Sequence, residues 1–182
     1  MAKKTFIEVD FPLKEVSEES VREKNIRHGH ISTLHIWWAR RPLAASRSTV
    51  FAALTPELKD EAELKKRLKF IAELSKWENS SNQTIIEEAR RLIREANNGR
   101  PPRILDCFAG GGAIPLEALR LGCETYALDY NPVATLILKA VLEYPQKYGK
   151  KQVESKEGLV PTSTNPLLED VKKWGNWVLG ES

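Results

Sequence analysis

The stretch Arg103–Leu116, RILDCFAGGGAIPL, decides the fold of this chain. Its short apolar run, Ile104–Phe108, has the length and composition of a buried strand, and Asp106 lies near the carboxyl end of that strand. Three glycines follow, and an apolar pattern at helical spacing then begins over Ala113–Leu121. Glycines adopt backbone angles that other residues avoid, and they lack the Cβ that would block a ligand. The pattern predicts a strand, a glycine loop and a helix that cradle a nucleotide-type cofactor, with a tight structural turn as the alternative.

The residues after this helix repeat the same order of elements. Cys123–Leu128 predicts a second strand with Asp129 at its carboxyl end, and Pro132–Glu143 predicts another helix. A β-α-β-α order implies parallel strands joined by right-handed crossovers. We therefore expect an α/β fold in which residues 103–143 begin a Rossmann-like sheet, preceded by a helical N-terminal region. Two strands alone cannot form a stable doubly wound core, so we expect the fold to be incomplete.

The rest of the chain divides into segments of different composition. In the first of them, FIEVDF at 6–11 suits a short strand or an extended arm, and Pro42 suits the first turn of a helix. Outside the unit described above we expect an N-terminal segment at 1–56, a helical pair at 57–100, a loop at 144–165 and an amphipathic helix at 166–180.

The composition is that of a globular chain of one domain, or one and a part. Of its 182 residues, 41% are hydrophobic and 29% are charged, which argues against global disorder. No apolar run approaches the roughly 18 residues that cross a bilayer, and the N-terminus has no apolar core of the signal-peptide kind. Cys107 and Cys123 are too few for a disulfide framework and have no metal-binding spacing. We therefore expect a cytoplasmic protein.

Basic residues cluster in the first third of the chain, although the net charge is only +3. No acidic residue lies between Glu23 and Glu57. Such a stripe favours a polyanion such as DNA, and an ordinary solvated face is the alternative. We expect three of its arginines to meet phosphates or the carboxylate of a cofactor, namely Arg40, Arg41 and Arg47.

The same region holds all three histidines and two of the five tryptophans. Trp37 and Trp38 are candidates for stacking on a base or for the core, and the core is favoured because neighbouring tryptophans cannot share one helical face. No cysteine or acid completes a known metal spacing, so we expect no metal and expect the histidines to bond backbone or phosphate. They are His28, His30 and His35.

Two carboxylates indicate which cofactor the glycine loop holds. Asp129, at the end of the second predicted strand, suits both hydroxyls of a ribose, as in NAD-binding proteins. However, Pro115 stands where G-x-G-x-x-G has its third glycine, and Asp106 suits a cationic group better than a pyrophosphate. S-adenosylmethionine carries such a group in its ammonium, beside a sulfonium. We therefore expect S-adenosylmethionine.

Three stretches resemble one enzyme family. DCFAGGGAIPLEALRLGCETYALDYNPVA, at 106–134, resembles the first cofactor motif of amino-group DNA methyltransferases, D-P-F-x-G-x-G-[ST], with the D-x-N-P element after the second strand. IRHGHISTLHIWWARRPLAASR, at 26–47, resembles the N-terminal part of DUF1156-containing adenine-specific DNA methylases, and DVKKWGNWVL, at 170–179, is similar to a helix of that family. The resemblance implies transfer of a methyl group from S-adenosylmethionine to the exocyclic amine of adenine in DNA.

The resemblance also implies roles for particular residues. The segment 28–47 would pack on the methionine end of the cofactor, and Asp129 would bind the ribose. Cys107 and Ala113 depart from the motif, and both are small. The cofactor loop would comprise Asp106, Phe108, Gly110 and Gly112, and the adenine ring would lie beside Tyr130 and Asn131.

One motif of the family is missing from these 182 residues. Such enzymes orient the target amine with [DNS]-P-P-[YFW], which neither NPVA at 131–134 nor NPLL at 165–168 matches. We therefore expect a fragment or a split enzyme, with the catalytic motif on a second polypeptide or a C-terminal region. A non-catalytic module that binds S-adenosylmethionine or DNA is the alternative. An NAD-linked oxidoreductase would need a complete sheet and a proton donor, and the sequence indicates neither.

Overall fold

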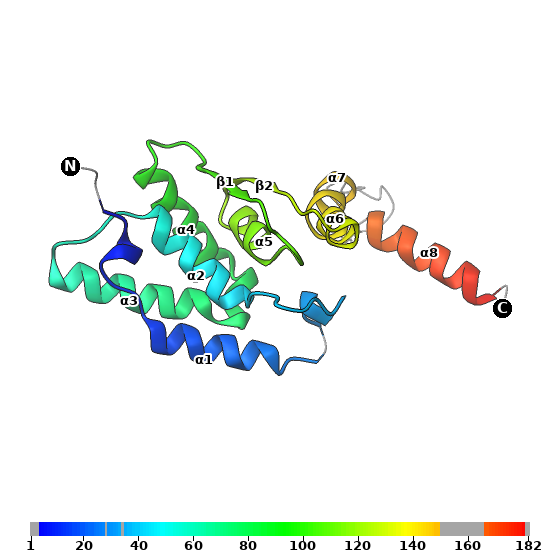
Figure 1. The fold of residues 1–182 in the computed structure, drawn as a ribbon, viewed down its shortest axis with the longest axis horizontal. Coiled ribbons are helices and arrows are strands. Elements are labelled where there is room, and N and C mark those ends of the chain that lie inside the picture. The colour runs from blue at the N-terminus through cyan, green and yellow to red at the C-terminus, as the bar shows by residue number, and fades with distance from the viewer. Residues whose placement is uncertain (1–3, 28, 34, 150–165, 181–182) are drawn as a thin grey trace, which may run out of the picture.

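The computed structural model describes residues 4–27, 29–33, 35–149 and 166–180 of the chain. It is a mixed α/β structure, mostly helical, with a small parallel sheet of two strands (Figure 1). Every helix in these ranges is too short or too polar to cross a membrane. The longer elements are α1 (Leu13–Lys24), α2 (Leu43–Leu54), α3 (Glu61–Ser75), α4 (Gln83–Ala96), β1 (Arg103–Asp106), α5 (Ala113–Arg120), β2 (Glu124–Ala127), α6 (Pro132–Leu138) and α8 (Pro166–Gly180).

Helices α1 to α4 form a layer with a continuous apolar core. Phe51 of α2 is fully buried and contacts Phe70 of α3, with ring centroids 5.4 Å apart. In the segment 57–100 the structure has α3 and α4, which begin where Asp60 and Asn82 accept hydrogen bonds from backbone N–H groups of the first turn. Pro42 lies immediately before α2, as its lack of an N–H group predicts.

The sheet lies against this layer through helix α5. β1 and β2 are parallel, and Arg103 pairs with Glu124 and Leu105 with Tyr126. Because side chains alternate along a strand, these four point to one face, and Ile104 and Asp106 point to the other. α5 packs against α2, and the core includes Ala118 of α5, Leu121 immediately after that helix, and Cys123. The predicted β-α-β-α order is thus confirmed, over somewhat shorter strands than expected.

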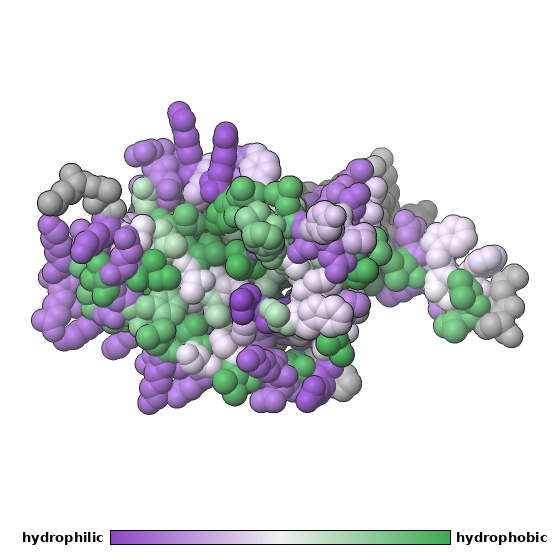
Figure 2. All heavy atoms as spheres, in the orientation of Figure 1, coloured by the Kyte–Doolittle hydropathy of each residue, from purple (hydrophilic) through white to green (hydrophobic). Residues whose placement is uncertain are grey.

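The second face of the sheet is open in the described part of the chain. Leu105 is 64% exposed, Tyr126 49% and Leu128 55%. Hydrophobic side chains appear in Figure 2 over the place where Figure 1 puts β1, β2 and α5. Helix α8 extends away from the other helices (Figure 1), and its apolar residues, Trp174 among them, are exposed. The helix has the bounds expected for it, Pro166–Gly180, and its amphipathic character stays a prediction.

Two expected boundaries are wrong. Residues 6–11 do not form a strand, because Glu8 reaches back to accept the backbone N–H of Thr5 at 2.6 Å and closes a 3-10 turn at Phe6–Glu8. The expected loop begins later than residue 144. A π-helical turn at Lys139–Glu143 leads into a helix at Tyr144–Tyr148, labelled α7. The wider turn accommodates Pro145, whose ring would clash with a regular helix before it. The remainder of that loop, residues 150–165, lies outside the described residues.

Candidate functional site

The glycine loop, residues 107–112, connects β1 to α5 and is tied to the end of β2. Leu128 donates its N–H to the carbonyl of Asp106 at 2.8 Å, and Ala109 donates to the carbonyl of Leu128 at 3.0 Å. Gly110 and Gly112 have φ angles of 49° and 79°, in the left-handed region that favours glycine. Gly112 stands immediately before α5, so the loop delivers the chain directly into the helix.

Asp129 clamps this loop from the end of β2. One carboxylate oxygen accepts the N–H of Gly110 at 2.8 Å, and the other accepts the N–H of Asn131 at 2.8 Å. These hydrogen bonds, Asn131 first and Gly110 second, lower the pKa of the Asp129 carboxyl. Each oxygen keeps a further lone pair, so an ionised carboxylate faces the pocket with capacity for the hydroxyls of a ligand.

Asp106 lies on the other side of the loop. It is half-buried, and its carboxylate accepts the N–H of Phe108 at 3.1 Å. The two predicted carboxylates therefore line one pocket. Phe108, in contrast, is 86% exposed at the pocket rim, and its ring is not packed by any described side chain that would fix it.

A second loop, residues 35–41, packs on the glycines and forms the other wall of the pocket. We call it the roof loop. A Cβ at Gly110 would lie 2.7 Å from Nε1 of Trp37, so the bare Cα of this glycine admits the indole. Nη2 of Arg40 donates to the carbonyl of Gly111 at 3.3 Å. Burial lowers the pKa of Arg40, which nevertheless stays a cation at neutral pH because an arginine titrates far above it.

The resulting glycine-loop pocket has a volume of about 370 Å³. Two carboxylates and two guanidinium groups line it, so it can hold a molecule with both a cationic and an anionic group. Its lining residues are Trp37, Ala39, Arg40, Arg41, Asp106, Phe108, Ala109, Gly110, Gly111, Ala113, Ile114 and Asp129.

Arg47 does not belong to this site, which corrects the expectation that it meets phosphate or cofactor. Its side chain is buried, with Nε 3.6 Å from a carboxylate oxygen of Glu117 in α5, and Nη2 donates to the carbonyl of Ser75 at 3.3 Å. Burial raises the pKa of the Glu117 carboxyl, against the opposing effect of Arg47 and Arg120. Arg47 therefore joins α2 to α5 instead of facing a polyanion.

The expectation that the tryptophans fill the core is also wrong. Trp38 is 79% exposed, and Trp37 is partly exposed over the glycine loop. The segment 35–41 is a loop and not a helix, so the two rings need not share a helical face. Tyr130 is fully exposed and lies outside the pocket lining, and Asn131 caps α6 by accepting the N–H of Val133 at 2.9 Å.

The histidines occupy different environments. His28 lies outside the described residues. His30 is buried, with Nε2 3.4 Å from Glu23 and its ring 4.3 Å from that of Trp77, whereas His35 is exposed in the roof loop. Among the described residues, no group of histidine, cysteine or acidic side chains is placed to hold a metal ion.

Two buried acids were missed by sequence reasoning. Glu23 accepts the N–H groups of Leu43 and Ala44 at 2.8 and 2.9 Å, and it thereby holds the start of α2 just after the roof loop. No sequence signal marks this contact, because twenty residues separate the partners. Glu117 does carry a signal. It lies four residues after Ala113 and four before Leu121, on the apolar face of the predicted helix, where an acid needs a partner.

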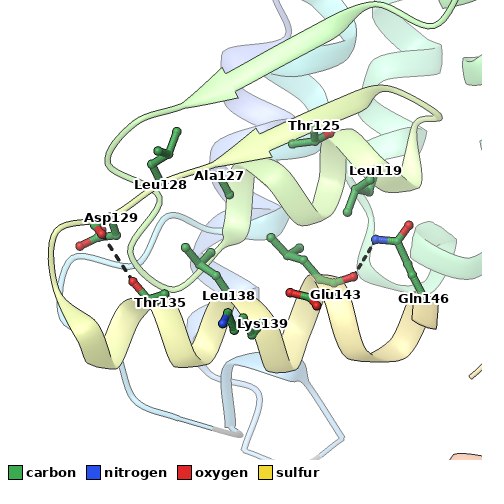
Figure 3. Close-up of a pocket in the computed structure, with 11 residues that line it drawn as sticks. Leu119, Thr125, Ala127, Leu128, Asp129, Thr135, Leu138, Lys139, Glu143 and Gln146 are labelled. Carbon is green, nitrogen blue, oxygen red and sulfur yellow. Dashed lines mark hydrogen bonds between the residues drawn. The ribbon is translucent and has the colours of Figure 1, made fainter. Parts of the chain in front are cut away.

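A larger apolar cleft of about 480 Å³ lies between β2 and the helical run α6–α7 (Figure 3). Leu119, Ala127 and Leu138 point into it. Its polar lining residues form hydrogen bonds within the chain, such as the one that the Thr135 hydroxyl donates to the carbonyl of Asp129. In the described residues β2 pairs only with β1, so this cleft runs beside an unpaired strand edge. Apolar side chains line most of it, and its charged lining residues are Lys139, Glu143 and Asp129, the last of which also lines the glycine-loop pocket.

The thiols of the chain differ in environment. Cys107 is exposed in the glycine loop, whereas Cys123 is buried in the core, where burial raises its pKa to about 11. Neither has a cysteine partner.

Comparison with known proteins gives two matches. Residues 10–80 match a family described as a protein of unknown function, DUF1156. A serine hydroxymethyltransferase of Plasmodium falciparum is 32% identical over 108 residues, which are 57% of this chain and 23% of that enzyme. The chain thus spans less than a quarter of that relative's length. No solved structure matches the chain significantly. Over residues 10–80, which include the roof loop, the chain is therefore similar to DUF1156.

Proposed function

We propose that this chain is the cofactor-binding part of an S-adenosylmethionine-dependent DNA methyltransferase that acts on the exocyclic amine of adenine. The catalytic [DNS]-P-P-[YFW] motif lies outside the chain, on a second polypeptide or a C-terminal region. In this proposal residues 103–143 begin a Rossmann-like sheet, and the open sheet face and the cleft beside β2 are where the remaining elements pack.

The convergence of opposite charges on the glycine loop carries the proposal. Asp129 would accept the ribose hydroxyls, and Asp106 would face the ammonium group, because both carboxylates line the same pocket. Arg40, whose Nη2 already reaches the carbonyl of Gly111, would pair with the carboxylate of the ligand. A zwitterionic amino acid joined to a ribose presents this set of groups, whereas a pyrophosphate would meet two carboxylates.

The pocket also fits such a ligand in size. Its volume of about 370 Å³ lies within the roughly 300–1,000 Å³ of small-molecule sites. When bound, S-adenosylmethionine would supply a methyl group already activated by the sulfonium. The residues of this chain would bind and orient it, so their contribution is placement.

A basic surface beside the pocket supports the DNA part of the proposal. Lys24 and Arg41 are exposed, and with Arg40 they line a hollow of about 430 Å³ that shares Trp37 with the glycine-loop pocket. Such groups suit phosphates of a nucleic acid brought to the cofactor. The adjacent base would then have to leave the helix to reach the methyl group.

The alternative is a non-catalytic module that binds the same cofactor or DNA. The absence of [DNS]-P-P-[YFW] from these 182 residues favours such a module. The module would bind the cofactor at the same glycine-loop pocket.

Calorimetric titration of S-adenosylmethionine into the full chain tests the proposal. We expect saturable binding that Asp129→Asn abolishes. Glu124→Gln is the matched control, because Glu124 is exposed at the opposite end of the same strand. Absence of binding by a chain that circular dichroism shows to be folded would overturn the proposal, as would equal binding by Asp129→Asn.

Adding the protein that carries [DNS]-P-P-[YFW] separates enzyme from module. Transfer of a labelled methyl group to adenine in DNA, dependent on Asp129, is the result expected of the enzyme. Cofactor binding without any transfer in the reconstituted pair would favour the module.

A further inference from the structure

A second hollow adjoins the glycine-loop pocket and is unusually aromatic. It has a volume of about 300 Å³, and Trp37 lines both hollows. We name it the aromatic slot and define it by its lining residues, which are His35, Ile36, Trp37, Trp38, Asn131 and Val133. Four of the six are consecutive in the roof loop, and two follow Asp129 at the end of β2.

The slot presents aromatic faces that no described side chain covers. Trp38 is 79% exposed and Ile36 89%. The rings of Trp37 and Trp38 have centroids 5.9 Å apart at 39°, and those of His35 and Trp37 are 6.3 Å apart at 46°. The rings are therefore tilted and not stacked on one another, which leaves π-faces for a planar ligand. Large exposed aromatic groups gathered at one place mark a binding site more often than chance.

One polar group gives the slot a direction. Asn131 accepts the N–H of Val133 through Oδ1 at 2.9 Å, which fixes the orientation of the amide. Its NH₂ group keeps two donors for a ligand, since no described residue accepts them, and ring nitrogens of a purine are suitable acceptors. Pyrimidines and aliphatic groups offer fewer such acceptors at the edge of a stacked ring.

The position of the slot relative to Asp129 determines which part of a ligand enters it. Asp129 and Asn131 are two residues apart, so their Cα atoms lie within about 7 Å. A ribose held by Asp129 therefore places its base beside Asn131, while the opposite end of the ligand lies toward Asp106 and Arg40.

We infer that the aromatic slot binds the purine ring of the ligand that the glycine loop holds, with Trp38 as the stacking residue. This inference rests on the proposed function, in which the purine is the adenine of S-adenosylmethionine. It assigns to the roof loop, within the DUF1156-like segment, a part in cofactor specificity. Tyr130, which the resemblance placed beside the adenine, lies outside the slot.

Variants of exposed residues test the inference without endangering the fold. Binding of S-adenosylmethionine and of adenosine is measured by calorimetry on the full chain and on Trp38→Ala, Trp38→Phe and Trp174→Ala. Trp174 is the control, because it is exposed in α8 and does not line the slot. Since stacking of a base on an aromatic side chain is lost with the ring, Trp38→Ala should weaken both ligands about tenfold or more. Trp38→Phe should restore most of the affinity, and Trp174→Ala should bind as the unchanged chain does.

A further variant tests the amide. Asn131→Ser keeps an oxygen that caps α6 but lacks the NH₂ donors, so it should weaken adenosine binding severalfold while the thermal midpoint stays unchanged.

The outcomes separate the inference from the proposed function. If S-adenosylmethionine binds and Trp38→Ala binds it equally well, the inference is overturned and the proposed function stands. If adenosine binds through Trp38 and S-adenosylmethionine does not bind, the slot is a purine site and the proposed function fails. If neither ligand binds, both are overturned. The same variants are also titrated with single-stranded DNA. If Trp38→Ala binds both small ligands unchanged and loses affinity only for the DNA, the slot takes a base of the nucleic acid, which also overturns the inference.

Discussion

The helical layer and the two-stranded sheet differ in how completely they bury their apolar surfaces. The layer of α1 to α4 buries both sides of α2, and residues such as Phe51, Ile71 and Leu74 are inaccessible to solvent. The sheet buries one face on α5 and leaves Leu105 and Tyr126 largely exposed on the other. Most of the stability therefore resides in the helices, while the sheet supports the glycine-loop pocket.

Substitution of a large core residue should have the greatest effect on stability, and it tests the difference between the two regions most directly. Phe51→Ala should lower the free energy of unfolding by about 3–5 kcal/mol, because it removes a fully buried ring. Leu105→Ala, on the open sheet face, should change it by no more than about 0.5 kcal/mol. Urea denaturation followed by circular dichroism measures both. Equal losses would mean that the sheet face is covered in solution.

The ion pair between the two regions comes next in size. Arg47→Met should cost about 3 kcal/mol, because it leaves the buried carboxylate of Glu117 with Arg120 alone. The double variant Arg47→Met, Glu117→Met should recover much of the loss, since Arg120 is partly exposed and can turn to solvent. Denaturant midpoints of the two single variants and the double variant provide the cycle, and strictly additive losses would contradict a direct interaction.

Removal of helix caps should have smaller effects on stability, which differ between the two regions. Asp60→Ala, at the start of α3, should reduce global stability by about 1 kcal/mol. Asn131→Ala removes an equivalent cap from α6, yet we expect its effect to be confined to faster hydrogen exchange in α6 and α7, because these helices border the open cleft. Equal shifts in the denaturation midpoint would show that the two regions unfold as one unit.

The smallest expected effect concerns pH. Burial lowers the pKa of His30, a change that Glu23 opposes and that Arg40 and Arg120 reinforce. The folded chain therefore binds this proton less readily than the unfolded chain, so the contribution of neutral His30 is present above pH 6.5 and is lost as the pH falls below it. Thermal midpoints measured from pH 7.5 to 5.5 should decline less in His30→Gln than in His35→Gln. An unchanged decline would exclude His30 as the cause.

Local patterns predicted the elements around the site, whereas long-range contacts decided the roles of several residues. The change of period at Ile104, the glycines and Asp129 indicated the strand–loop–helix unit, because strand, turn and cap signals are contained within a few residues. Arg47 was assigned wrongly because its partner, Glu117, is seventy residues away. Trp38 was assigned to the core on the argument that neighbouring tryptophans cannot share one helical face, whereas residues 35–41 form a loop. The helix at 144–148 was missed because Pro145 normally ends a helix, whereas here a π-helical turn before it lets the helix continue.

The different environments of the two thiols allow selective labelling beside the pocket. Cys107 is exposed in the glycine loop, between the pocket-lining residues Asp106 and Phe108, and the raised pKa of Cys123 together with its burial keeps that thiol un-ionised and shielded. A maleimide-linked fluorophore should therefore attach at a single position without any engineered cysteine. The label would stand next to Asp106, so its emission would follow every molecule that enters or leaves the glycine loop.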